Sequence, residues 1–221
     1  MEFDFGVILA NGRFLAYGVW ITVLLSLVSG AASLVAGLAV TLLRLYGPLA
    51  LRPVLVLYVD SMRAIPVLVV LVWTFFALPL LAGVTMSPFT AALLGLTVHL
   101  AAYAAEIVRA GIESVRPGQT RAALALGMSR AQILRRIVLP QALVRMLPAF
   151  GSLLSVTIKD TAIASVIAVP ELMRQSETVA GQSFQPIEVY TFAMLAYFLL
   201  LFPVTRGVDR LYRRVAHLGR S

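Results

Sequence analysis

Two adjacent residues of opposite charge, Lys159 and Asp160, interrupt an otherwise uncharged stretch that runs from Met146 to Pro170. An α-amino acid carries both an ammonium and a carboxylate group, so such a pair has the charges needed to bind one. Because positions i and i+1 do not share a helix face, we predict that one side chain lines a solute pathway, with Thr161 beside it. The other then pairs with a neighbouring helix or subunit. The alternative is a structural ion pair that fixes helix packing.

A second group of charged residues consists of two pairs, Asp60 with Arg63 and Glu106 with Arg109. The members of each pair are three positions apart, so each pair can meet on one helix face. Across two helices the four side chains could form a polar gate below the pathway, and Tyr103, one turn before Glu106, could line the same pathway. The alternative is that these charges anchor helix ends at the membrane surface and that the tyrosine serves packing.

Other kinds of chemistry have no support in the sequence. The chain has no cysteine, and its two histidines, His99 and His217, are too far apart for the usual spacing of metal ligands. The apolar stretches hold neither a Ser/His nor a paired-Asp arrangement, so we expect no catalytic residue, and an intramembrane enzyme is disfavoured. No G-x-x-x-x-G-K-S/T loop is present to bind nucleotide phosphates. We therefore expect no metal and no cofactor on this chain, with ATP and Mg²⁺ used by a separate partner.

These residues are positioned by a chain with the composition of a membrane protein. Of its 221 residues 60% are hydrophobic and 13% are charged, and the mean hydropathy is +0.93, whereas about a quarter of the residues in soluble domains are charged. No charge lies between Arg13 and Arg44 or between Arg63 and Glu106, and a membrane-spanning helix needs about 20 apolar residues. The sequence predicts a single domain, residues 1–221, of an all-α integral membrane protein with five transmembrane helices, at about 17–43, 54–81, 88–110, 148–169 and 190–211.

The distribution of basic residues predicts the orientation in the membrane. With five spans, most arginines fall on one side, including those within 109–145 and 206–220, whereas the other side keeps Arg13, Arg174 and half of the acids, namely Glu2, Asp4, Glu171, Glu177 and Glu188. The positive-inside rule then puts the N-terminus outside and the C-terminus in the cytoplasm. The same rule accounts for most of the net charge of +8, so no nucleic-acid partner is needed to explain it. The acidic N-terminus lacks the basic region of a cleaved signal peptide, so we expect the first span to be retained.

The segment of about 113–140, between the third and fourth spans, is predicted to be a structured cytoplasmic loop. Pro117 begins a helix-forming stretch, and Gly127 suits the left-handed residue after a helix. Ser129 with Gln132 fits a capping box that starts a second short helix, which Pro140 limits. Three interpretations are a DNA-reading helix-turn-helix, an amphipathic loop on anionic headgroups and a rigid docking element for a cytoplasmic partner. Membrane spans tether both ends of the segment, which argues against DNA, and we favour the docking element.

The stretch GQTRAALALGMSRAQILRRIVLPQA resembles the EAA loop in the permease subunits of bacterial ABC importers. The resemblance implies that this loop forms the coupling helix, which sits in a cleft of the ATPase subunit. The residues implied in this coupling are Arg121, Ala122, Ala123, Gly127, Ser129, Leu139 and Pro140. Arg121 departs from the family pattern, because it stands where the glutamate of the motif usually lies. If the family uses this glutamate in a salt bridge to the ATPase, then in this chain the salt bridge is absent, has its charges reversed, or uses an acid at another position.

Three further stretches, AAYAAEIVRAGIESVRPGQ, MRAIPVLVVLVW and IKDTAIASVIAVPEL, are similar to segments of the polar-amino-acid branch of these permeases. The resemblance implies a type I importer fold in the bacterial inner (cytoplasmic) membrane, with a second permease subunit, two ABC ATPase subunits and a periplasmic or extracellular solute-binding protein. It also implies alternating access for an amino acid or amino-acid-like solute, with the separate ATPase as the energy source. The alternative is a channel-like or structural membrane subunit without ATP coupling. The basic C-terminal segment is expected to touch anionic membrane lipid.

Overall fold

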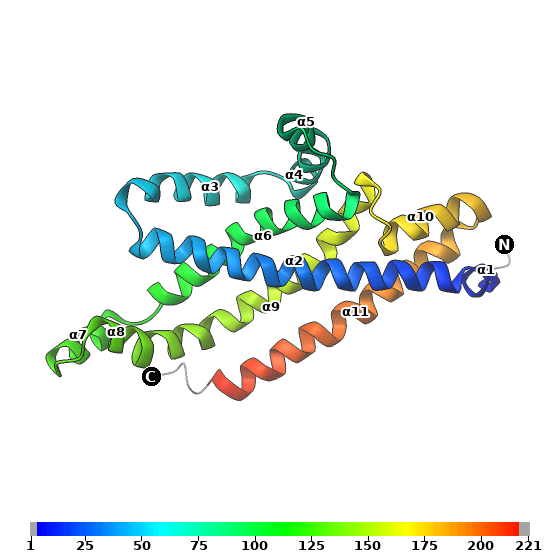
Figure 1. The fold of residues 1–221 in the computed structure, drawn as a ribbon. Coiled ribbons are helices and arrows are strands. Elements are labelled where there is room, and N and C mark those ends of the chain that lie inside the picture. The colour runs from blue at the N-terminus through cyan, green and yellow to red at the C-terminus, as the bar shows by residue number, and fades with distance from the viewer. Residues whose placement is uncertain (1–3, 217–221) are drawn as a thin grey trace.

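The computed structural model describes residues 4–216, and this part of the chain is all-helical (Figure 1). The longest helix, α2 (Gly12–Tyr46), runs through the middle of the bundle beside α6 (Pro88–Glu113), and the short α1 (Gly6–Ala10) precedes it. α9 (Leu139–Ile163) packs against both, and α11 (Pro186–Val215) lies against α9. Four helices in the described range are long and apolar enough to cross a bilayer. The prediction of an all-α membrane protein is confirmed.

Small residues allow α2 and α6 to approach closely. A Cβ atom added at Gly37 would lie 2.6 Å from the Cβ atom of Ala104 and 2.8 Å from the backbone oxygen of Ala101, so only glycine fits there. One turn along α2, the Thr41 hydroxyl donates a hydrogen bond of 2.8 Å to the Ala105 carbonyl. Close packing of small residues and interhelical hydrogen bonds stabilise helix pairs within membranes. Both features hold α6 in a fixed position along α2.

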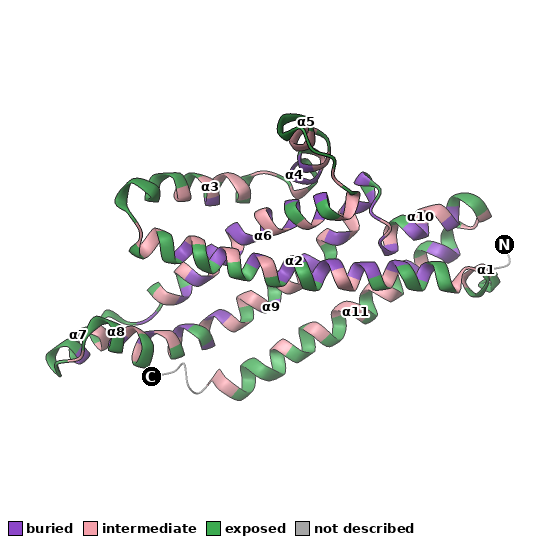
Figure 2. Ribbon diagram, in the orientation of Figure 1, coloured by how far each residue is buried: buried purple, intermediate pink, exposed green. Residues whose placement is uncertain are grey.

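Burial is concentrated on α2 and α6, whereas α3 and α11 are mostly exposed (Figure 2). The main hydrophobic core joins α2, α6 and α9 with α4 (Val67–Val72) through buried residues such as Leu25, Leu71, Leu100 and Leu153. Many large apolar side chains of α11 remain exposed. In a membrane, such a surface can face lipid without an unfavourable contact.

The second predicted span, 54–81, is broken by a sharp bend rather than formed by one straight helix. The chain forms a 3-10 turn (Leu49–Leu51), α3 (Arg52–Ala64), α4 (Val67–Val72), a π-helical turn (Trp73–Ala77) and α5 (Leu78–Ala82). The helices before and after Pro66 are bent by 109°. Proline lacks an N–H and disfavours helical backbone in the preceding residue, and Ile65 is accordingly extended, with φ −83° and ψ 132°. The five predicted spans are therefore four long helices and one broken pair.

The fourth predicted span, 148–169, belongs to a much longer helix. α8 (Arg130–Ile133), a π-helical turn (Leu134–Val138), α9 and a 3-10 turn (Ala164–Ile167) form one continuous helical run. The prediction that Pro140 limits a short helix is wrong. In a regular helix, the missing N–H of Pro140 would have met the carbonyl of Arg136, which belongs to the π-helical turn. A local change in helical hydrogen bonding thus absorbs the proline.

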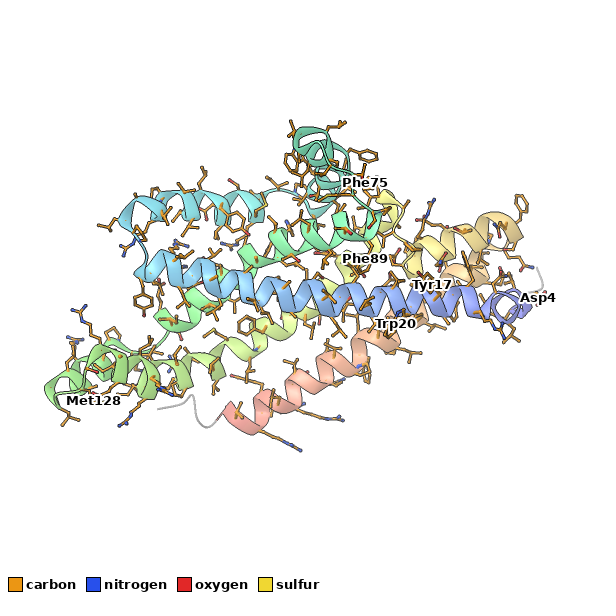
Figure 3. All side chains as sticks on the ribbon, viewed as in Figure 1. Asp4, Tyr17, Trp20, Phe75, Phe89 and Met128 are labelled. Atoms are coloured by element: carbon orange, nitrogen blue, oxygen red, sulfur yellow. The ribbon has the colours of Figure 1, made fainter. Side chains whose placement is uncertain are left out.

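The two ends of the bundle differ. α7 (Pro117–Ala125) and α8 form one end, and α1 and α10 (Leu172–Ser183) form the other (Figure 1). Figure 3 marks these ends with the labelled side chains of Met128 and Asp4. The predicted orientation requires the N-terminus and the 113–140 segment to lie on opposite sides of the membrane, and the structure places them at opposite ends. Which end faces the cytoplasm stays a prediction.

A buried acid fixes α10 against the long helices. The Glu171 side chain is fully buried, and its carboxylate caps α10 by accepting hydrogen bonds from the backbone N–H groups of Met173 (2.8 Å) and Arg174 (2.7 Å). It also accepts a bond of 2.7 Å from the Tyr197 hydroxyl of α11, and the Leu172 N–H donates to a threonine hydroxyl of α2. Burial raises the pKa of Glu171 to about 6 against the opposing effect of these hydrogen bonds.

Candidate functional site

A cavity of about 740 Å³ lies between the bend at Pro66, α6 and α9. This volume is within the range of sites that hold small molecules. Three residues with charged side chains, Arg63, Glu106 and Asp160, line it together with mostly apolar neighbours. The cavity therefore brings charges of both signs together within helices that are long and apolar enough to cross a membrane. Its other lining residues are Ala64, Ile65, Pro66, Val67, His99, Tyr103, Ile107, Ala149, Ser152, Leu153 and Val156.

Asp160 lies one turn before the end of α9 and is half-buried in the cavity wall. Its carboxyl group makes no hydrogen bond or ion pair with residues 4–216. Lys159 is exposed and does not line the cavity, as expected for neighbours on different helix faces. Since no ion pair joins Lys159 to Asp160 or to another described residue, the structural ion pair considered above is not formed within residues 4–216. Thr161 is fully buried, donates a 2.7 Å hydrogen bond to the Ile158 carbonyl and does not line the cavity.

An aromatic pair on α6, His99 and Tyr103, forms part of the cavity wall. Their ring centroids are 5.3 Å apart, and the Tyr103 hydroxyl donates a hydrogen bond of 3.3 Å to the Arg63 carbonyl. His99 is 4% exposed, and its Nδ1 has no hydrogen-bond partner in the described part of the chain. Sequence reasoning missed His99 as a cavity residue, although its position four residues before Tyr103 places both on one helix face. The other histidine, His217, lies outside the described residues.

Glu106 is surrounded by three arginines beside the cavity. Its carboxylate lies 2.5 Å from the Arg109 guanidinium, 3.8 Å from that of Arg44 and 3.9 Å from that of Arg63. The contacts with Arg109 on the same helix and with Arg63 across helices agree with the predicted grouping. Asp60 is exposed and forms no ion pair within the described range. Arg44 was missed because it lies on α2, far from Glu106 in sequence, and only the fold brings the two together.

The segment 117–138, which comprises α7, the turn after it, α8 and the π-helical turn, forms a compact projection that we call the knob. Gly127 has a left-handed backbone (φ +75°), as predicted for a residue after a helix. The predicted capping box is also present, since the Ser129 N–H donates to Gln132 Oε1 (2.8 Å) and the Gln132 N–H donates to Ser129 Oγ (3.3 Å). Ala123 is 3% exposed and packs with Ile133 in a small core beneath the knob.

The implied coupling residues do not share one environment. Arg121 and Ala122 on α7, Gly127 in the turn after it and Ser129 at the start of α8 are exposed. The other three differ in burial or position. Ala123 is buried within the knob, whereas the half-buried Leu139 and the exposed Pro140 lie at the start of α9. The knob is therefore a folded element whose small core continues into α6 and α9, and the exposed members of the set are accessible to a partner.

Comparison with known proteins matches nearly the whole chain. Residues 5–217 match the family described as "binding-protein-dependent transport system inner membrane component". The chain is 33% identical over 216 residues to the glutamine transport system permease protein GlnP of Escherichia coli (strain K12), covering 97% of this chain and 99% of that protein. It is 36% identical over 200 residues to the probable amino-acid ABC transporter permease protein YckA of Bacillus subtilis (strain 168), covering 90% and 88%. The crystal structure of an amino acid ABC transporter with histidines contains a similar chain, with 30% identity, a TM-score of 0.91 and coverage of 97% and 100%.

Proposed function

Because the chain belongs to the family of binding-protein-dependent transport system inner membrane components, we propose that it is the permease subunit of an ABC importer for an amino acid or amino-acid-like solute. Its fold is that of type I ABC importer permeases, and it is a transport subunit rather than an enzyme. Similarity to amino-acid permeases supports this function over the channel-like or structural alternative. The observation that supports an amino-acid substrate is the cavity, because Asp160, which has no partner within residues 4–216, and Arg63 both line it.

The cavity suits a zwitterion. An ionisable group at membrane depth is costly unless it has a partner, and the free Asp160 carboxyl offers one for the α-ammonium group of a solute. The Arg63 side chain is 41% exposed, so its guanidinium has N–H groups left to bind an α-carboxylate. Tyr103 and His99 supply an aromatic wall between α3 and α9. Lys159 and Thr161, which face elsewhere, would serve the pathway only through contacts outside this cavity.

Arg63 also connects the cavity to the Glu106 cluster. The Arg63 guanidinium lies 3.9 Å from the Glu106 carboxylate, whereas that of Arg109 lies 2.5 Å from it. The ion pair with Arg63 is therefore the longest of the three that Glu106 makes. A solute carboxylate would compete with Glu106 for Arg63 and would loosen the contact between α3 and α6. We propose that this exchange forms the gate, with Arg109 holding Glu106 in place and Asp60 at the exposed rim.

Alternating access requires energy that this chain does not supply. We propose that ATP and Mg²⁺ are used by two ABC ATPase subunits that contact the knob, and that this chain binds no cofactor. A second permease subunit, identical or homologous, and a periplasmic or extracellular solute-binding protein complete the importer. The chain is a multi-pass membrane protein, and we place it in the bacterial inner membrane with its N-terminus outside, its C-terminus inside and no role for nucleic acid.

Reconstitution tests this function. The permease, co-purified with a candidate ABC ATPase subunit, is placed in proteoliposomes and supplied with ATP, a candidate binding protein and radiolabelled amino acids. We expect uptake that requires both ATP and the ATPase, and no ATP hydrolysis by the permease alone. Solute flux without ATP would instead support a channel, and robust ATP hydrolysis by the isolated chain would refute a subunit that depends on a partner.

A further inference from the structure

The knob carries charge of only one sign. Between Glu113 and Asp160 the chain has six arginines and no acid. Five of them are exposed on the knob or directly before it and form no ion pair within residues 4–216: Arg116, Arg121, Arg130, Arg135 and Arg136. The knob therefore presents positive charge that the described chain does not neutralise.

The tip of the knob also presents apolar surface. Leu124 is 49% exposed and Leu126, directly before the left-handed Gly127, is 83% exposed. The capping box and the buried Ala123 hold α7 and α8 together. The two leucines therefore belong to an ordered helix–turn–helix element and not to an unstructured loop. An apolar centre with a polar, charged rim is the usual composition of a protein docking surface. Here every charge on the rim is positive.

No acid in the described chain replaces the glutamate that the EAA resemblance implies at position 121. The acid nearest in sequence, Glu113, lies at the end of α6 and is paired with Arg109. Glu106 is occupied by its three arginines. The sequence raised the possibility that the acid is supplied elsewhere, and the knob itself does not supply it because residues 117–138 contain no Asp or Glu.

We propose that the knob docks into a cleft of the ATPase subunit that has an apolar floor and an acidic rim, with a carboxylate of the ATPase paired to Arg121. This inference rests on the proposed function and adds the charge of the partner surface. A basic partner surface would place like charges together, which costs several kcal/mol at an interface. A neutral one would leave the Arg121 guanidinium without a partner wherever contact excludes water.

Anionic lipid headgroups are the other surface that could attract these arginines. An amphipathic helix that binds a membrane surface lies flat in the interface. The knob instead extends along the bundle, beyond the neighbouring ends of α2, α3 and α11 (Figure 1). The end of the knob, marked by Met128 in Figure 3, thus lies away from the long helices, which favours a protein partner over the membrane.

Charge reversal at Arg121 tests the proposal. The permease is placed in nanodiscs of neutral lipid, and binding of its purified ATPase is measured at low and high salt. We expect Arg121→Glu to weaken binding about tenfold or more at low salt, and Arg121→Lys to remain within about threefold of the wild type, since long-range charge complementarity is kept. Arg210→Glu on α11 makes the same charge change at another exposed arginine and should leave the affinity unchanged. Thermal unfolding of each variant shows that the permease itself is intact.

The outcomes separate this inference from the proposed function. Tighter or unchanged binding of the ATPase to Arg121→Glu would overturn an acidic cleft. The proposal would also be overturned if the variant lost association with anionic vesicles but bound the ATPase as the wild type does, because lipid would then be the partner. If the wild-type permease bound no ATPase at all, the proposed function itself would fail.

Discussion

Replacing Asp160 by Asn should weaken solute binding about 10- to 100-fold without destabilising the permease. A hydrogen bond to a charged group contributes about 1.5–3 kcal/mol, and 1.36 kcal/mol corresponds to a factor of ten. The carboxyl makes no bond with residues 4–216 and the two side chains have nearly the same shape, so the substitution removes no packing. It also removes a half-buried charge that has no partner. We therefore expect the variant to unfold at the same temperature as the wild type or above it.

The assay is ATP-driven uptake in proteoliposomes that contain the ATPase, with KM measured over a wide range of solute concentrations. Lys159→Gln is the matched control, because Lys159 is the exposed neighbour that does not line the cavity. Its KM should stay within about twofold of the wild-type value, since exposed charges contribute little. An unchanged KM for Asp160→Asn, or an equal rise in both variants, would refute the assignment of Asp160 to the solute. Loss of expression alone would favour a structural role.

Three further substitutions test other parts of the structure. Gly127→Val should leave complex assembly intact but uncouple ATP hydrolysis from uptake, since its φ of +75° costs a non-glycine residue about 1–3 kcal/mol and the turn beside Leu126 would shift; full uptake per ATP would contradict this. Gly37→Val should lower the free energy of unfolding by about 1–3 kcal/mol through overpacking against α6. Its control is Gly207→Ala, where an added Cβ meets no atom within 4 Å. For Glu171, whose pKa rises from 4.5 to about 6 on folding, the folded chain holds the proton more tightly. The stability that Glu171 contributes should therefore be greatest below pH 4.5 and fall by about 2 kcal/mol as pH rises through 6, and denaturant titrations should show a flatter profile for Glu171→Gln.

Features that depend on neighbouring residues were predictable because the physics that produces them is local. Ser129 and Gln132 form their capping box at the predicted spacing, and Gly127 adopts the left-handed backbone that ends the preceding helix. Helix geometry alone placed Glu106 beside Arg109 and kept Lys159 off the face of Asp160. Each of these predictions needed only the helical repeat and the hydrogen-bonding capacity of single side chains.

Features that depend on tertiary contacts were missed or wrong. Nothing in the local sequence distinguishes Pro66, which bends its segment by 109°, from Pro140, which a π-helical turn absorbs without ending the helix. Both prolines lack the same N–H, and the difference lies in whether the surrounding turn can rearrange its hydrogen bonds. Arg44 likewise joins Glu106 only because Gly37 lets α2 lie close to α6. Charge clusters that span three helices therefore require the packing before they can be recognised.

The connection between the knob and the cavity follows from helix continuity. α6 carries Tyr103 and Glu106 and ends at Glu113, just before the knob, while the run Arg130–Ile167 begins in the knob and carries Asp160 near its far end. A partner that moves the rigid knob must therefore move two walls of the cavity. The third wall, at the Pro66 bend, packs against α6 and α9 but belongs to neither of the helices that enter the knob, so it need not follow the same movement. The weak contact between Arg63 on that third wall and Glu106 on α6 lies where the walls would separate. A movement of the knob would thus first break the ion pair between Arg63 and Glu106, the same contact for which a solute carboxylate competes.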